Sequence, residues 1–136
     1  MEQVKISIIT ITYNSEQTVE ETLKSVISQA YPNLEYIIVD GASKDRTLEV
    51  VGKYKESIAH IISEPDKGIA DAFNKGIRMA TGDLIGIINS DDLLLPGALR
   101  KMAESYDGET DVYNDGKARR TQAKSILLGV LYGRGE

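Results

Sequence analysis

The sequence lacks features that mark several specialised classes of protein. It contains no cysteine, which excludes a disulfide framework and a metal site built from thiolates. No apolar run approaches the roughly 20 residues that a membrane-spanning helix needs. The first residues, Met1 to Lys5, lack the basic and then apolar plan of a secretory signal. These absences predict a cytoplasmic protein, and a location at the inner surface of the membrane is compatible with them.

Charge is distributed unevenly along a chain of otherwise ordinary composition, with 136 residues, 41% hydrophobic and 27% charged. Residues 113–136 hold five of the 16 basic and two of the 21 acidic residues, a net charge of +3. Residues 1–112 hold the other 11 and 19 and carry −8, for a total of −5. We therefore expect one domain, residues 1–112, and a tail, residues 113–136. The acidic domain is a poor binder of nucleic acid but is compatible with a site that recruits metal ions.

Strand and helix patterns alternate along residues 1–112. Runs of β-branched and apolar residues predict strands at 4–12, 34–39, 58–62 and 84–88. Apolar residues at helical spacing predict helices at 16–29, around 48–54, at 69–80 and from 95 onward. This order predicts an α/β fold, a three-layer α-β-α sandwich around a mostly parallel sheet. In such folds the carboxyl ends of the strands lie along one edge, where ligands bind.

Each predicted strand is followed by polar residues. The four clusters are Thr12-Tyr13-Asn14, Asp40-Gly41, Glu64-Pro65-Asp66-Lys67-Gly68 and Asn89-Ser90-Asp91-Asp92. All four are therefore expected at the same edge of the sheet. Two adjacent carboxylates repel each other unless a positive charge lies beside them, so Asp91-Asp92 points to a divalent metal ion. The single histidine, His60, falls in the third strand, and we interpret it as structural.

Two long segments resemble family-two glycosyltransferases of the GT-A fold. They are SIITITYNSEQTVEETLKSVISQAYPNLEYIIVDGASKDRTLEVV and SEPDKGIADAFNKGIRMATGDLIGIINSDDLLLPGAL, and the resemblance covers residues 4–112. It implies a Rossmann-like nucleotide-diphospho-sugar transferase fold. It also implies transfer of a sugar from a nucleoside-diphosphate donor, with UDP as the expected nucleotide, to a hydroxyl acceptor in cell-surface polysaccharide synthesis.

The resemblance assigns donor-binding roles to matching positions. Thr12 and Tyr13 match residues that hold the uracil and ribose, and Asp40 matches a carboxylate that hydrogen-bonds the nucleobase. The segment DKGIADAFNKG resembles the lining of the diphosphate and sugar region, where Lys67 neutralises charge. The implied donor-binding residues are Thr12, Tyr13, Asn14, Asp40, Asp66, Lys67, Asn74 and Asp91.

Asp91 and Asp92 are also the candidate metal ligands, for Mg²⁺ or Mn²⁺. These hard cations favour carboxylate and phosphate oxygens, and one or two protein carboxylates suffice when substrate phosphates complete the shell. Asn89 stands where many relatives carry the first Asp, which predicts weaker metal affinity. The family's general base is an Asp in a later, acceptor-binding half. We therefore expect a truncated enzyme in which donor binding outlasts catalysis, and we assign no catalytic residue.

Other interpretations of the same residues remain open. Asp40-Gly41 alone is typical of a turn, and Asp91-Asp92 alone is typical of a helix cap. The chain as a whole could be a non-catalytic module that binds a nucleotide, or one that self-associates through an exposed sheet edge. A third possibility is a nucleic-acid function of the basic tail.

The tail segment RTQAKSILLGVLYG resembles the nucleotide-binding helix of family-A DNA polymerases. Arg120, Lys124 and Leu128, followed by Tyr132-Gly133, match that motif, and their spacing of four predicts one helical face. The alternative is an amphipathic helix packed on the sheet. Both interpretations predict a helix from Arg120 to Gly133.

Overall fold

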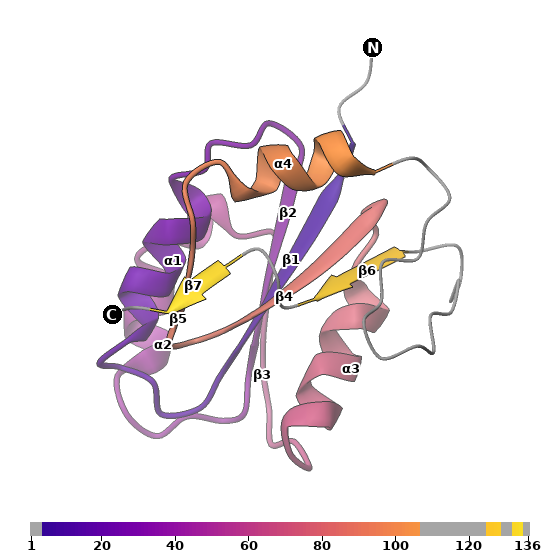
Figure 1. Ribbon diagram of the computed structural model, residues 1–136. Coiled ribbons are helices and arrows are strands. Elements are labelled where there is room, and N and C mark those ends of the chain that lie inside the picture. Colours follow the sequence, from indigo (N-terminus) through magenta and orange to yellow (C-terminus); the bar gives the residue numbers. More distant parts are fainter. Residues whose placement is uncertain (1–3, 107–124, 129–131, 135–136) are drawn as a thin grey trace.

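The computed structural model describes residues 4–106, 125–128 and 132–134 (Figure 1). The elements are β1 (Ile6–Thr12), α1 (Val19–Ile27), β2 (Leu34–Asp40), α2 (Thr47–Gly52), the 3₁₀ helix η1 (Lys55–Ser57), β3 (His60–Ser63), α3 (Ile69–Met79), β4 (Leu84–Asn89), β5 (Asp92–Leu94), α4 (Ala98–Ser105), β6 (Ser125–Leu128) and β7 (Tyr132–Arg134). The four strands and four helices predicted for residues 1–112 are all present.

The central sheet has five strands in the order β3-β2-β1-β4-β6, and every neighbouring pair is parallel. Strands β1 and β2 pair from Ile6↔Leu34 to Thr12↔Asp40, and β1 pairs with β4 as far as Ile11↔Asn89. The carboxyl ends of these strands therefore meet at one edge. This arrangement confirms the predicted α/β fold with a mostly parallel sheet.

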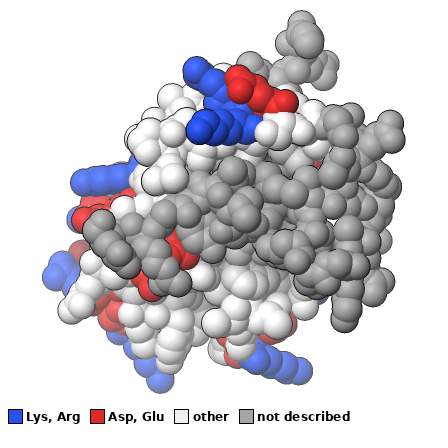
Figure 2. All heavy atoms as spheres, in the orientation of Figure 1, with Lys and Arg blue, Asp and Glu red and all other residues white. Residues whose placement is uncertain are grey.

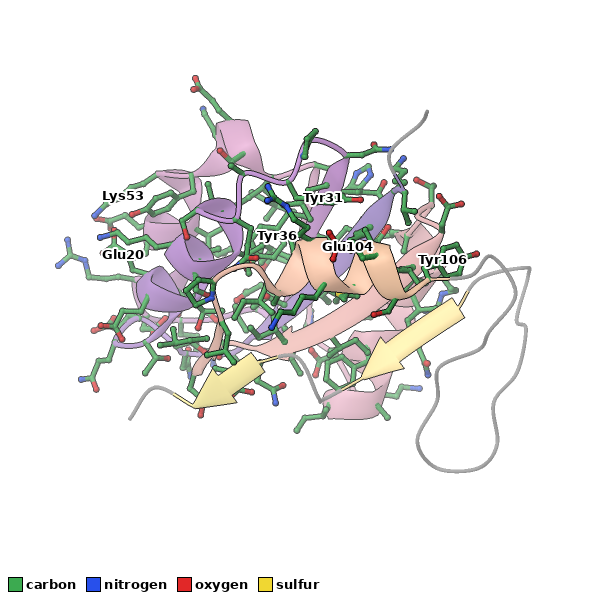
Figure 3. All side chains as sticks on the ribbon, turned by 45° about the horizontal axis from the view of Figure 1, so that its top comes forward. Glu20, Tyr31, Tyr36, Lys53, Glu104 and Tyr106 are labelled. Carbon is green, nitrogen blue, oxygen red and sulfur yellow. The ribbon has the colours of Figure 1, made fainter. Side chains whose placement is uncertain are left out.

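Helices cover both faces of the sheet (Figure 1). Alternate residues of β1 point to opposite faces: Ile6 and Ile8 pack with α1 and α4, whereas Ile9 packs against α3. Helix α3 approaches the sheet closely at Gly76, where an added Cβ would lie 2.6 Å from Cγ2 of Ile9. On the α1 face, Tyr36 is buried (Figure 3), and its hydroxyl lies 2.9 Å from that of Thr10. Burial raises the pKa of Tyr36, so this phenol stays neutral.

The helix predicted for the tail is wrong where the structure describes it. Residues 125–128 form β6, which extends the sheet in parallel beside β4, and residues 132–134 form β7, which pairs antiparallel with β5. The periodicity of a short apolar run does not distinguish a helix from a buried strand, and the edge of β4 supplies a partner. The polymerase resemblance is therefore unsupported. Arg120 and Lys124 lie outside the described residues, and the division at residue 113 stays a prediction.

Within the described residues, none of the helices has the length and apolar character needed to cross a bilayer. Strand β3 forms one edge of the five-stranded sheet. Self-association through an edge stays a prediction.

Candidate functional site

A cavity of about 610 Å³ opens at the carboxyl edge of the sheet. Its lining comes from the residues after β1, the loop before α3, the first turn of α3 and the turn after β4. Five of the predicted donor-binding residues belong to this lining: Thr12, Tyr13, Asn14, Asp66 and Asp91. The parallel topology therefore brings together side chains that are as much as 79 positions apart in the sequence.

Asp40 is completely buried next to this lining and is held by four hydrogen bonds. Its Oδ1 accepts from the hydroxyls of Thr12 and Ser43, both at 2.6 Å. Its Oδ2 accepts from the backbone N–H of Ser43 and the hydroxyl of Ser63, both at 2.8 Å. These donors occupy the roughly four lone-pair sites of a carboxylate. Asp40 thus joins the ends of three strands, and a nucleobase N–H has to displace one of these donors to bind it.

The loop after β1 is held to the residues after β2 by hydrogen bonds. Asn14 has a φ of 47°, a left-handed conformation that asparagine tolerates. Its backbone N–H donates to the Ser43 hydroxyl at 2.8 Å, and its Oδ1 accepts from the backbone N–H of Lys44 at 2.8 Å. The backbone N–H of Ser15 donates to the Thr47 hydroxyl at 2.7 Å. This wall of the cavity is therefore formed without a ligand.

Asp45 anchors the same loop pair. Its carboxylate accepts from the backbone N–H of Thr47 at 2.9 Å and from that of Glu16 at 3.2 Å, and it also accepts from the Thr47 hydroxyl. Partial desolvation raises the pKa of Asp45, but the bonds from Thr47 and Glu16 outweigh it and hold this pKa below the usual range. Asp45 is therefore ionised at neutral pH, as an anchor of hydrogen bonds should be.

Tyr13 and Asp66 meet over Gly41. A Cβ added at Gly41 would lie 2.7 Å from Oδ2 of Asp66 and 3.5 Å from Cδ1 of Tyr13. Residues that follow β1, β2 and β3 therefore converge at one point, and a side chain at position 41 would require the Asp66 carboxylate to move. The side chain of Tyr13 is 61% exposed, which leaves its ring available to a planar ligand.

The two adjacent carboxylates after β4, Asp91 and Asp92, lie in different environments. Asp91 lies in the turn between β4 and β5, is exposed and lines the cavity. Asp92 begins β5, is 5% exposed and does not belong to the lining. The cavity therefore receives one carboxylate of the pair. The structure does not bring Asp92 to the expected metal position.

Lys67 and Asn74 are also outside the cavity lining. Both are exposed, and the backbone N–H of Lys67 donates to Asp71 at 2.9 Å. Helix α3 contributes to the cavity through its first turn, at Ile69 and Ala72, so Asn74 lies beyond that turn.

Sequence analysis missed several hydroxyl residues of the site. Ser15 and Ser90 line the cavity, and their hydroxyl oxygens lie 2.9 Å apart, linking the segments after β1 and β4. Ser43 and Ser63 hold Asp40. Ser90 belongs to a polar cluster that the sequence placed at this edge, but no role was assigned to it. Ser63 was open to detection because it ends β3, one residue later than the expected end of that strand.

Asp91 fits a divalent metal, although the described residues contain no cluster of three or more His, Asp or Glu that could hold an ion alone. Asn89 and Asp66 contribute further oxygen atoms to the same lining. Carboxylate and amide oxygens suit Mg²⁺ and Mn²⁺, which commonly take one or two protein ligands and complete their shell with phosphates and water. Asp91 is therefore the residue that would hold the ion.

Comparisons with known proteins show that the chain is similar to glycosyltransferases. The chain is 38% identical over 101 residues to EpsE of Bacillus subtilis (strain 168), which is named as a glycosyltransferase; the match covers 71% of this chain and 36% of EpsE. It is 40% identical over 88 residues to the Escherichia coli UDP-Glc:alpha-D-GlcNAc-diphosphoundecaprenol beta-1,3-glucosyltransferase WfaP, covering 64% of this chain and 35% of WfaP.

A similar solved structure is the mannosyltransferase PcManGT of Pyrobaculum calidifontis in complex with GDP-Man and Mn²⁺. It superposes with a TM-score of 0.69 at 29% identity, covering 79% of this chain and 34% of that one. The chain spans about a third of the length of these relatives. The family model described as glycosyl transferase family 2 matches residues 7–127. The parallel sheet and the cavity at its carboxyl edge are consistent with this match. The chain therefore belongs to glycosyl transferase family 2.

Proposed function

We propose that the cavity at the carboxyl edge binds a nucleoside-diphosphate sugar as the donor site of a glycosyltransferase that acts in cell-surface polysaccharide synthesis. The observation that carries the proposal is the convergence of the strand ends on one cavity: Thr12 ends β1, Asp66 lies in the loop after β3 and Asp91 lies in the turn after β4. The name of the E. coli relative supports UDP as the nucleotide, and its acceptor supports a role in polysaccharide assembly. The GDP-Man complex supports the donor class.

The residues of the lining match the parts of such a donor. The exposed ring of Tyr13 can cover a base, and Thr12 and Asn14 supply polar atoms around it. Asp91 would hold Mn²⁺ or Mg²⁺, as the Mn²⁺ in the P. calidifontis complex supports. When bound, this ion supplies Lewis-acid stabilisation of the departing nucleoside diphosphate. We assign no general base among the described residues, so the proposal concerns donor binding first and sugar transfer second.

The nucleic-acid alternative was predicted for the basic tail, most of which lies outside the described residues, so it stays a prediction. Figure 2 shows acidic and basic side chains interspersed over the described part of one face. A phosphate backbone is bound by a clustered basic surface, and its affinity falls steeply with salt.

Calorimetry with UDP, in Mn²⁺ and in EDTA, tests the proposal. We expect UDP to bind at least about tenfold more tightly with Mn²⁺, and Asp91→Ala to remove this enhancement, because the variant loses the carboxylate that would hold the ion. Glu104→Ala is the matched control, since Glu104 is an exposed carboxylate on α4 that does not line the cavity (Figure 3). A UDP affinity that changes neither with Mn²⁺ nor in Asp91→Ala would contradict the proposal.

A further inference from the structure

Side chains of α1, and one just after its end, form hydrogen bonds with the chain that follows β4. Thr22 and Ser25 are three positions apart and lie on one side of the helix, and Gln29 follows two residues after the end of the helix. The Ser25 hydroxyl accepts from the backbone N–H of Leu94 at 3.0 Å, and Nε2 of Gln29 donates to the carbonyl of Leu95 at 2.9 Å. These contacts hold β5 and the residues after it against α1.

Thr22 makes the contact that bears on the cavity. Its hydroxyl oxygen lies 2.9 Å from the carbonyl oxygen of Ser90 and 2.7 Å from that of Asp92, and the hydroxyl donates toward both. These two carbonyls flank Asp91 on either side. Thr22 is completely buried. A threonine inside a helix commonly donates to its own helix, so a hydroxyl turned outward to two carbonyls of a distant turn has a definite structural role.

This contact sets the direction of Asp91. Because the carbonyls before and after Asp91 are both drawn toward α1, the turn presents the intervening side chain to the opposite side, where it lines the cavity. Ser90 is held a second time through the contact of its hydroxyl with Ser15 at 2.9 Å. The carboxylate of Asp91 is thus carried on a turn that is held by the buried hydroxyl of Thr22 and by the contact between Ser90 and Ser15.

We propose that Thr22 is a positioning residue that orients Asp91 for metal-dependent binding of the nucleoside diphosphate. The inference rests on the proposed function. Thr22 does not line the cavity, so it acts through the backbone of the turn and not on the ligand. Residues that orient a metal ligand commonly change metal affinity about 10- to 100-fold when they are lost.

The test measures the ratio of the UDP dissociation constants in EDTA and in Mn²⁺, which isolates the metal-dependent part of binding. We expect Thr22→Val to lower this ratio about tenfold, because it replaces the donor with a methyl group, and Thr22→Ser to keep it within about twofold of wild type. Ser25→Ala is the matched control, because it removes a hydroxyl from the same side of α1 that contacts Leu94 and not the carbonyls beside Asp91. Thr22→Ala removes the hydroxyl without the added methyl and serves if the valine variant does not fold.

The outcomes separate the inference from the function on which it rests. A wild-type ratio near one overturns the proposed metal-dependent donor site and the inference with it. A large wild-type ratio that Asp91→Ala abolishes, but that Thr22→Val and Thr22→Ala leave unchanged, overturns the inference alone. A loss of thermal stability with an unchanged ratio also overturns it, because Thr22 would then only hold β5 in place.

Discussion

The two ends of the sheet carry the same kind of cross-strand pair, a hydroxyl on β1 that donates to a carboxylate on β2. At the amino end, Ser7 lies in register with Glu35 and donates to it at 2.6 Å. At the carboxyl end, Thr12 lies in register with Asp40 and also donates at 2.6 Å. Both carboxylates are buried, Glu35 at 6% and Asp40 at 0% exposure. Their surroundings nevertheless differ.

The amino end is closed around its carboxylate. Glu35 accepts from the backbone N–H of Thr81 at 2.8 Å and from its hydroxyl at 3.1 Å, and Nζ of Lys5 lies 4.0 Å away. A Cβ added at Gly82 would lie 2.6 Å from the Ser7 hydroxyl, so the backbone fills the remaining space. Nε2 of His60 lies 3.6 Å from Glu35, in agreement with a structural role for that histidine.

The carboxyl end uses its carboxylate to hold loops at the edge of a cavity. The donors to Asp40 are neutral hydroxyl and amide groups, and one of them, Thr12, lines the cavity itself. A buried carboxylate at a strand end is therefore not a binding site by itself. The loops that continue from the strand decide whether it closes a packed end or supports an open one.

Replacing the two carboxylates should give the largest difference between the ends. We expect Asp40→Ala to lower the free energy of unfolding by about 3 kcal/mol, because several buried donors lose their acceptor, and to weaken UDP binding about tenfold or more. We expect Glu35→Ala to cost about 2 kcal/mol and to leave UDP binding unchanged, because the cavity lies at the other end of the sheet. Urea denaturation and calorimetry measure both effects. An equal loss of UDP affinity in the two variants would remove the distinction.

The strand ends could be predicted from the sequence because they depend on chain order alone. Apolar periodicity located β1 to β4, and the parallel topology then placed Thr12, Asp66 and Asp91 on one edge. Strand β5 was missed because its three residues, which precede the helix predicted from residue 95, are too few to show a period. Strand β6 was missed because its pairing with β4, and not its own sequence, decides its conformation.

The directions of individual side chains were beyond the sequence. Asp91 and Asp92 are the same residue type side by side, and only the structure shows that the first lines the cavity while the second is buried in β5. Asn74 belongs to the recognised motif, yet the part of α3 that lines the cavity ends before it. Ser63 was missed as a partner of Asp40 because the two become neighbours only when β2 and β3 pair, whereas Ser43 is only three residues away and bonds Asp40 within the loop after β2.

Acid should weaken the amino end through Glu35. Burial raises the pKa of Glu35, but hydrogen bonds from Ser7 and Thr81 and the charge of Lys5 outweigh it and hold this pKa below the ordinary value of 4.5. A folded-state pKa below the unfolded one gives a stabilisation that is complete above pH 4.5 and is lost as the pH falls through the folded-state pKa. The difference in unfolding free energy between wild type and Glu35→Gln should therefore shrink as the pH is lowered below 4.5. Urea denaturation at a series of pH values measures it, and a difference that does not change with pH would contradict the assignment.

Salt should produce the smallest effect and should again separate the two ends. The side chain of Lys5 is 38% exposed, so we expect Lys5→Met to cost only about 0.5 kcal/mol or less, and this cost should fade at about 1 M salt because the ion pair is screened. Ser63→Ala removes a neutral donor to Asp40 and should cost about 1 kcal/mol at either salt concentration, because the hydroxyl that is lost carries no charge. Parallel urea denaturation at low and high salt measures both variants. A salt-dependent cost for Ser63→Ala would contradict the assignment of neutral donors to Asp40. The contrast between a carboxyl end held by neutral donors and an amino end assisted by Lys5 would then fail.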